Sequence, residues 1–413
     1  MRISDLTKGK KKYVALALLF VGWLLSFLDR MVMNIAVIPI KEEFNLDPSM
    51  VGIILSSFFI SYACMQIPGG WLADKIGSRK LVIFAIAFWS LFTIFSGLAW
   101  SLASLVIIRI LFGIGEGFYP SASQKGISEF FPKNERSKAS STMMSSNFFG
   151  AALGPLIAAP LIVWLGWRHM FVAIGVVGFL LVAAFWFFYR PAAQTEKIEV
   201  KIKETNKVPL KNLLNNSGIW KIVVMWFAAG IINWGFSSWM PIYLVETRNL
   251  DILSVGLIAS VPALLGGFAT ILSGILLNKY FINTEKYYAA GGMLLTTVFL
   301  YLMIISDSMV AVVIYWNLVF IFKSFVFSVA FSLPHQLLPK EAIGTGMGMV
   351  NTGAQAAGFI APIVMGFIIS ATGSYDTAFF FLVACGILST IAALSITKKD
   401  RKVSPQNAEI AME

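Results

Sequence analysis

The sequence has little charge, cysteine or histidine. Only 13% of its 413 residues are charged, whereas 58% are hydrophobic. Its two cysteines, Cys64 and Cys385, lie in separate apolar runs, so we expect neither a disulfide nor a metal site of the C-x-x-C type. Its two histidines, His169 and His335, have no nucleophile pattern around them. These absences argue against an enzyme and against a bound metal or cofactor.

Nucleotide-binding motifs are lacking as well. Segment 113–117 (GIGEG) has closely spaced glycines, but it has neither the preceding strand nor the spacing of a dinucleotide fingerprint. In an apolar helix such glycines are more typical of close approach between neighbouring backbones. Because there is also no Walker motif, the sequence indicates no direct use of ATP.

Long apolar runs are what the sequence has in abundance. A helix needs about 20 apolar residues to cross a bilayer. Twelve runs of about this length are present, at residues 13–39, 50–73, 80–99, 102–124, 138–164, 169–189, 219–245, 254–278, 287–306, 309–334, 343–371 and 376–397. We therefore predict an all-α membrane protein with twelve transmembrane helices.

One long polar stretch divides the chain. Residues 190–218 form a predicted linker between six helices in residues 1–189 and six more in residues 219–397, and residues 398–413 form a polar tail. Two six-helix bundles are typical of transporters whose substrate site lies between the halves, near the middle of the membrane.

Positive charge follows a pattern along the chain. The net charge is +11, and the basic residues gather in every second gap between runs. They lie at Arg2 and residues 8–12, Lys75, Arg79 and Lys80, Lys133, Arg136 and Lys138, residues 190–211, Lys279 and Lys286, Lys340, and residues 398–402. This is the positive-inside pattern and not a nucleic-acid-binding stripe, so we expect both termini and the linker in the cytoplasm of a cell-membrane protein.

Four charged residues interrupt the apolar runs. Asp29 and Arg30 lie in run 13–39, and Arg109 and Glu116 share one face of run 102–124 at i, i+7 spacing. A charge at this depth costs on the order of 3 kcal/mol, and such residues normally face a bundle interior or a water-filled path. Matched depth predicts an Asp29–Arg109 pair, with Arg30 facing the cavity and Glu116 a turn or two deeper. A static set of structural ion pairs is the alternative interpretation.

The chemistry of these groups suggests coupling. An arginine offers a planar fork for a carboxylate or phosphate and stays charged at physiological pH. A carboxyl group surrounded by apolar side chains can gain and lose a proton near neutrality, because loss of hydration disfavours its charged form. Protonation of such an acid would change which partner the arginines prefer.

Several motifs resemble those of the major facilitator superfamily. Segment 70–80 (GWLADKIGSRK) fits the signature loop of that superfamily in full, and segments 150–155 and 166–168 are similar to its G-x-x-x-G-P motif and to the start of its sixth helix. The resemblance implies that Asp74 and Arg79 act as a latch of the cytoplasmic gate, and that the working unit is a monomer.

Within that superfamily the chain is most similar to anion:cation symporters such as bacterial galactonate, hexuronate and glucarate carriers. The matching residues are Asp29 and Arg30, Tyr62 before segment 66–71, Arg109 with Glu116, and Asn351. The resemblance implies proton-coupled uptake of an organic anion such as a sugar acid. It makes Arg30, Tyr62 and Asn351 substrate contacts, Asp29 and Glu116 protonation sites, and Arg109 the partner of Asp29.

Two residues depart from this pattern. Asn147 stands where such carriers tend to have glutamine, so its reach toward a substrate hydroxyl is shorter. Lys323 interrupts run 309–334 where a small residue is expected. Two interpretations of Lys323 remain open: it is a second cationic anchor for the substrate, or it pairs with Asp29 or Glu116 in one transport state.

An exporter that exchanges a drug or metabolite for protons is the alternative function, because the G-x-x-x-G-P motif is enriched in antiporters. Export of lipophilic cations would need acidic residues along the cavity, whereas Arg30 and Lys323 favour an anion. The predicted partners are therefore a small organic anion, protons and the lipid bilayer, with the proton gradient as the energy source. Sodium in place of protons stays open, although a sodium site needs several oxygen ligands together and no such cluster is evident.

Overall fold

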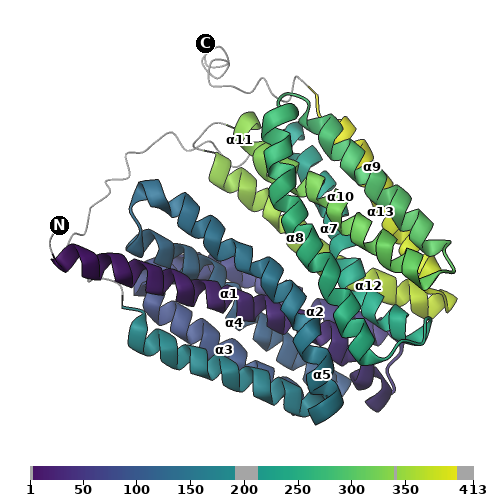
Figure 1. Ribbon diagram of the computed structural model, residues 1–413, viewed down its shortest axis with the longest axis horizontal. Coiled ribbons are helices and arrows are strands. Elements are labelled where there is room, and N and C mark those ends of the chain that lie inside the picture. Colours follow the sequence, from purple (N-terminus) through teal and green to yellow (C-terminus); the bar gives the residue numbers. More distant parts are fainter. Residues whose placement is uncertain (1–2, 191–212, 339–341, 398–413) are drawn as a thin grey trace. The chain divides into compact units, whose positions relative to one another are not determined.

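The structure of the chain, a computed structural model, describes residues 3–190, 213–338 and 342–397, and this part of the chain is helical without β-strands (Figure 1). The helices are α1 (Ile3–Glu43), α2 (Pro48–Ile76), α3 (Ser78–Gly97), α4 (Leu102–Phe130), α5 (Lys133–Phe188), α7 (Ser217–Glu246), α8 (Ile252–Tyr280), α9 (Glu285–Ile304), α10 (Met309–Ser332), α11 (Pro334–Leu337), α12 (Ile343–Thr372) and α13 (Tyr375–Leu394). In the described residues, eleven helices are long and apolar enough to cross a membrane.

The chain divides into two compact units. Unit 1 comprises residues 1–195 with 237–264, and unit 2 comprises residues 196–236 with 265–413. In unit 1, α1 packs on α5, α4 packs on α2 and α3, and α3 packs on α5; in unit 2, α9 packs on α10 and α13. The predicted linker lies largely outside the described residues, and the predicted tail lies wholly outside them.

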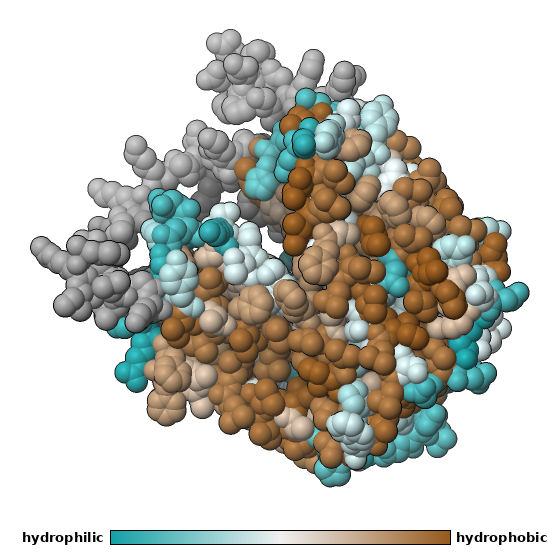
Figure 2. Space-filling model, in the orientation of Figure 1, coloured by the Kyte–Doolittle hydropathy of each residue, from teal (hydrophilic) through white to brown (hydrophobic). Residues whose placement is uncertain are grey.

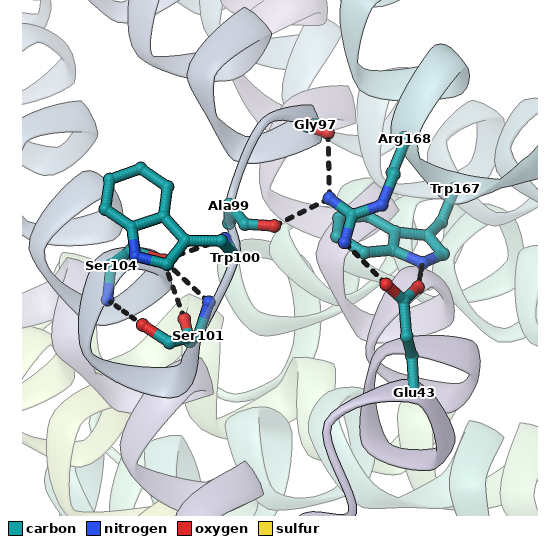
Figure 3. Close-up of polar contacts among 8 residues, drawn as sticks. All are labelled: Glu43, Gly97, Ala99, Trp100, Ser101, Ser104, Trp167 and Arg168. Carbon is teal, nitrogen blue, oxygen red and sulfur yellow. Dashed lines mark hydrogen bonds and ion pairs between the residues drawn. The ribbon is translucent and has the colours of Figure 1, made fainter.

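Polar residues set the helix ends close to where the apolar runs predicted them. Asp47 caps α2 by accepting a hydrogen bond from the backbone N–H of Met50, at 3.0 Å, and Pro48 follows at the first helical position. Hydrogen bonds from the Ser49 hydroxyl and the Met50 amide lower the pKa of Asp47. Ser101 and Ser104 form a reciprocal cap at the start of α4 (Figure 3).

The predicted runs 138–164 and 169–189 both fall within α5, which breaks at Gly166. The backbone there has φ 75° and ψ 159°, a conformation that favours glycine. The next two side chains hold the break in place (Figure 3): Trp167 Nε1 and Arg168 Nη2 donate to the two carboxylate oxygens of Glu43, at 2.7 and 2.5 Å. Arg168 Nη1 also donates to the carbonyls of Gly97 and Ala99, so one residue joins α1, α5 and the connection between α3 and α4.

Glycines let the helices that carry the buried charges approach closely. A Cβ on Gly113 would lie 2.5 Å from the carbonyl oxygen of Phe58, and one on Gly117 would lie 2.8 Å from that of Tyr62, both on α2. This confirms the predicted packing role of segment 113–117. A Cβ on Gly150 of α5 would lie 2.4 Å from the carbonyl oxygen of Leu24, so α5 contacts α1 backbone to backbone.

Hydrophobic side chains cover much of the surface in Figure 2, with polar residues gathered toward its edges. Among the exposed apolar residues are Trp164, Leu180 and Phe188 of α5, with exposed fractions of 76, 67 and 68%. Exposure of this kind along a helix is unfavourable in water and suits contact with lipid.

Candidate functional site

The centre of unit 1 holds a buried ion pair between α1 and α4. Arg30 Nε donates to Glu116 Oε2 at 2.6 Å, and the two side chains are only 5 and 0% exposed. Arg30 Nη2 also lies 3.4 Å from the Ser26 hydroxyl, one turn earlier on α1. Glu116 Oε1 is buried, and none of the described residues forms a hydrogen bond with it. The carboxylate therefore neutralises Arg30 through one oxygen, while its other oxygen keeps unused acceptor capacity.

Aromatic rings surround the Arg30 guanidinium. Its Cζ lies 4.3 Å from the ring centre of Tyr62, 4.9 Å from that of Phe58 and 4.8 Å from that of Phe27. Such contacts stabilise a cation by about 0.5–2 kcal/mol each, more where water is excluded. The predicted contact residue Tyr62 thus lies beside the predicted anion-binding residue Arg30.

Asp29 and Arg109 lie nearby but do not pair with each other. Asp29 Oδ2 accepts a hydrogen bond from the Thr93 hydroxyl of α3 at 3.1 Å, and its Oδ1 has no hydrogen-bond partner among the described residues. The Arg109 guanidinium lies over the Phe112 and Phe58 rings, at 4.6 and 5.5 Å, and its Nε has no hydrogen-bond partner in the part of the chain that the structure describes. Among the described residues, no ion pair within 4.0 Å joins Asp29 to Arg109. The predicted pairing is therefore replaced by Arg30–Glu116.

The helix ends explain this correction. The prediction measured depth from residue 39, but α1 continues to Glu43. At about 1.5 Å per residue, Arg30 lies about 20 Å before Glu43, and Glu116 lies about 21 Å after Leu102, the first residue of α4. The two residues therefore have equal depth, whereas Arg109 lies only about 10 Å from the start of α4.

In unit 2, Lys323 lies deep in the apolar helix α10. Its Nζ donates to Asn233 Oδ1 of α7 and lies 3.9 Å from the ring centre of Phe320. Asn351 is half-buried on α12. Asn147, the remaining predicted contact, is half-buried on α5 of unit 1, and its Oδ1 accepts no hydrogen bond from the described residues.

The predicted gate residues contact neighbouring helices within unit 1. Asp74 Oδ1 pairs with Lys125 Nζ of α4 at 2.8 Å. Arg79 Nη2 donates to the carbonyl of Trp186 near the end of α5 at 2.6 Å, and its Cζ lies 5.7 Å from the Trp186 ring. The signature loop between α2 and α3 is thus tied to both α4 and α5.

Sequence reasoning missed three partners of these residues. Lys125 is a basic residue at the end of a predicted span. It could have been paired with Asp74, because the charge pattern predicts both residues on the same side of the membrane. Asn233 is an isolated amide in an apolar run, which is a usable signal. Thr93 gives no such signal in the sequence. A threonine inside a membrane helix usually donates a hydrogen bond to a carbonyl of its own helix, as Thr93 also does to that of Trp89.

Comparison with known proteins identifies the family. The sequence profile of the Major Facilitator Superfamily matches residues 19–362 and 292–412, so the chain belongs to this superfamily.

Two relatives show what this branch of the family contains. The chain is 30% identical over 408 residues to a protein described as the probable sulfoacetate transporter SauU of Cupriavidus necator, which covers 94% of each chain. It is 29% identical over 447 residues to the probable galactarate/D-glucarate transporter GarP of Escherichia coli K12, covering 98% of this chain and all of the other. Both relatives are transporters and not enzymes, which confirms the expectation for this chain.

A solved structure shows the same fold. The crystal structure of a bacterial homologue of the human lysosomal transporter Spinster, inward-facing and unoccupied, matches with a TM-score of 0.84 at 18% identity. The match covers 96% of this chain and 99% of the other. The fold of the major facilitator superfamily is therefore present over almost the whole chain.

Proposed function

We propose that the protein is a secondary active transporter that takes up an organic anion together with protons by alternating access. The observation that carries the proposal is the Arg30–Glu116 ion pair, a buried base whose only ionic partner in the described residues is a buried acid. A carboxylate substrate offers Arg30 the same chemistry as Glu116 does. Substrate and Glu116 can therefore compete for one guanidinium.

Competition of this kind couples the anion to a proton. When Glu116 is protonated, it no longer neutralises Arg30, and an incoming anion takes over that role. When Glu116 loses its proton, it reclaims Arg30 and displaces the anion. Because each exchange keeps the buried charge balanced, substrate and proton bind and leave together. Asp29 is the second proposed protonation site, with Arg109 as the nearby counter-charge.

The substrate is proposed to be a sugar acid or a related carboxylate. The described relatives are named for sulfoacetate, galactarate and D-glucarate, all of which are organic acids. Tyr62, Asn147 and Asn351 are the proposed additional contacts. They supply hydroxyl and amide groups, which suit the hydroxyls and carboxylates of such acids.

The proposed arrangement has twelve spans in two six-helix bundles, with both termini in the cytoplasm of a cell-membrane monomer. The break at Gly166 supports counting α5 as two spans, because 56 continuous residues would be about 84 Å long, far more than a bilayer needs. Asp74 and Arg79 are proposed to latch the cytoplasmic gate through their contacts with α4 and α5.

The proton-coupling proposal is tested in liposomes that contain a pH-sensitive dye. The exterior is made acidic, and galactonate, glucuronate, glucarate, sulfoacetate and several aromatic and phosphorylated acids are offered in turn. We expect the interior to acidify only with a transported acid. Glu116→Gln should abolish this proton uptake yet keep exchange of labelled acid across the membrane, because Arg30 still binds the anion.

The matched control is Glu42→Gln, which removes an exposed carboxylate from the same helix as Arg30. It should leave both proton uptake and exchange unchanged. Silence toward every acid, together with a response to lipophilic drugs or to sodium, would overturn the proposal in favour of an exporter or a sodium-coupled carrier.

A further inference from the structure

We infer that Thr93 of α3 is a positioning residue for the proton carried by Asp29, so that Asp29 and Thr93 together form one proton-binding site. The inference rests on the proposed function, in which Asp29 is the second protonation site. Both residues belong to unit 1, and each is only 2% exposed. Their contact therefore joins two buried side chains within one compact unit.

The Thr93 hydroxyl lies between two oxygen atoms. It is 3.1 Å from Asp29 Oδ2 and 3.0 Å from the carbonyl oxygen of Trp89, one turn earlier on α3. A hydroxyl group has one proton to donate and two lone pairs that accept. It therefore makes a full hydrogen bond to only one of these two oxygens at a time.

Each protonation state of Asp29 uses this hydroxyl in a different way. A charged carboxylate only accepts, so Thr93 then donates to Asp29 Oδ2. A protonated carboxyl group donates to the Thr93 oxygen, and the Thr93 hydrogen turns to the Trp89 carbonyl. The buried carboxyl group thus keeps a hydrogen-bond partner whether or not it carries its proton, and the hydroxyl is satisfied in both states.

Helix packing fixes the position of this hydroxyl. A Cβ on Gly115 of α4 would lie 2.8 Å from the backbone nitrogen of Trp89, so α3 and α4 contact each other closely at the residue before Glu116. Thr93 is one helical turn from Trp89, and the contact therefore limits its movement as well. The hydroxyl stays within reach of Asp29 because the backbone that carries it is held in place.

Asp29 points to a different side of α1 from the anion-binding residue Arg30. Successive residues of a helix point about 100° apart. Asp29 meets Thr93 of α3, whereas Arg30 meets Glu116 of α4 and the Tyr62 ring of α2. Asp29 can therefore take up its proton without an anion bound to Arg30.

The charged groups that face Asp29 come from α1 and α4. Arg109 and Glu116 act on it electrostatically, and Arg30 is its neighbour in the chain. Lys41, at the end of α1, lies about 18 Å away along the helix. No charged residue occurs in the parts of the surrounding helices given by residues 48–73, 81–97 and 139–167. Removal of the Thr93 hydroxyl therefore changes a hydrogen bond of Asp29 and leaves these charges as they are.

Thr93→Val tests the inference, because valine has nearly the shape of threonine and lacks the hydroxyl. A hydrogen bond to a charged carboxylate is stronger than one to the protonated group, so its loss favours protonated Asp29. We expect uptake of the acid that the wild type transports fastest to reach half of its maximum at an external pH about one unit higher. Thr93→Ser should restore the wild-type midpoint, since serine keeps the hydroxyl.

An infrared titration of the purified protein gives a second readout that needs no substrate. The C=O band of a protonated carboxyl group that disappears in Asp29→Asn reports the protonation of Asp29. In Thr93→Val we expect the midpoint of this band to move upward by about the same one pH unit. The band should also change its frequency, because the hydroxyl that accepts from the carboxyl group is gone.

Ser96→Ala is the matched control on the same helix. Ser96 is buried and donates to the carbonyl of Phe92 at 2.9 Å, the same kind of bond that Thr93 makes to its own helix. Its loss should leave both the uptake midpoint and the infrared midpoint unchanged.

Three other outcomes have distinct meanings. An unchanged infrared midpoint in Thr93→Val, or slower uptake at every pH without a shift, would overturn the inference and leave Thr93 with a structural bond to Trp89. The lack of an Asp29 band in the wild type would overturn it as well. Transport of no acid in the panel would remove the proposed function, whereas the infrared titration would still decide whether Thr93 governs the proton on Asp29.

Discussion

Arg30 combines one hydrogen-bonded carboxylate with three aromatic rings, so both its charge and its flat shape are in use. Arg30→Lys keeps the charge and loses the planar fork and the stacking. We expect the KM for the transported acid to rise at least tenfold, which corresponds to about 1.4 kcal/mol of binding free energy, with a smaller change in kcat. Initial uptake rates over a range of acid concentrations measure both constants.

Arg136→Lys is the comparison at another arginine of unit 1. Arg136 donates to the carbonyls of Phe131 and Ser128, beside the start of α5. This change should leave the KM unchanged. If Arg30→Lys had the same KM as the wild-type protein, the anion would need no more than a point charge at this position, or would bind elsewhere.

For single residues, the sequence identifies the charged side chains of the site reliably. It is less reliable in predicting which of them form ion pairs with each other. Asp29, Arg30, Arg109 and Glu116 stand out because each interrupts an apolar run, and all four prove to be buried. Their pairing depends on where α1 ends, and an error of four residues shifts the estimated depth by about 6 Å, one full turn. No single-sequence pattern fixes helix ends and tilt to that accuracy.

Helices α1 and α5 contact each other through glycines, and this contact positions Asp29 and Arg30. Gly150→Ala would place a methyl group 2.4 Å from the Leu24 carbonyl oxygen, which is backbone and cannot move aside alone. Overpacking of this kind costs about 1–3 kcal/mol. We expect a melting temperature several degrees lower for the purified protein in detergent.

Gly274→Ala provides the control within α8, because nothing lies within 4 Å of the added methyl group. It should be neutral or slightly stabilising, since alanine favours a helix more than glycine does. A similar loss of stability in both variants would show that helix propensity or detergent sensitivity, and not the α1–α5 contact, governs the effect.

The helices themselves were largely predictable. Every apolar run lies on a helix, because runs of about 20 apolar residues can bury their backbone polar groups in lipid only as helices. Polar residues and prolines such as Asp47 and Pro48 then set the boundaries. The form of the break at Gly166 was less predictable, since a glycine with positive φ can break a helix without any polar loop.

For the whole molecule, the path of the chain through the membrane decides which ends share a side. If α5 crosses twice, residues near its start and its end lie on one side of the membrane and Gly166 lies on the other. The positive-inside pattern then places Lys133 in the cytoplasm and the Gly166 break outside. The Glu43–Arg168 contact agrees with this arrangement, because it sets the end of α1 beside the break.

Single cysteines measure this directly in intact cells. The background carries Cys64→Ser and Cys385→Ser, which removes both native thiols. In that background, Leu165→Cys should react with a membrane-impermeant maleimide from outside, because residue 165 is 48% exposed beside the break. Lys133→Cys should react only after the cells are permeabilised. Labelling of both positions from outside, or of neither, would contradict a second crossing within α5. It would also contradict the placement of both termini in the cytoplasm, because an odd number of spans places the two ends of the chain on opposite sides.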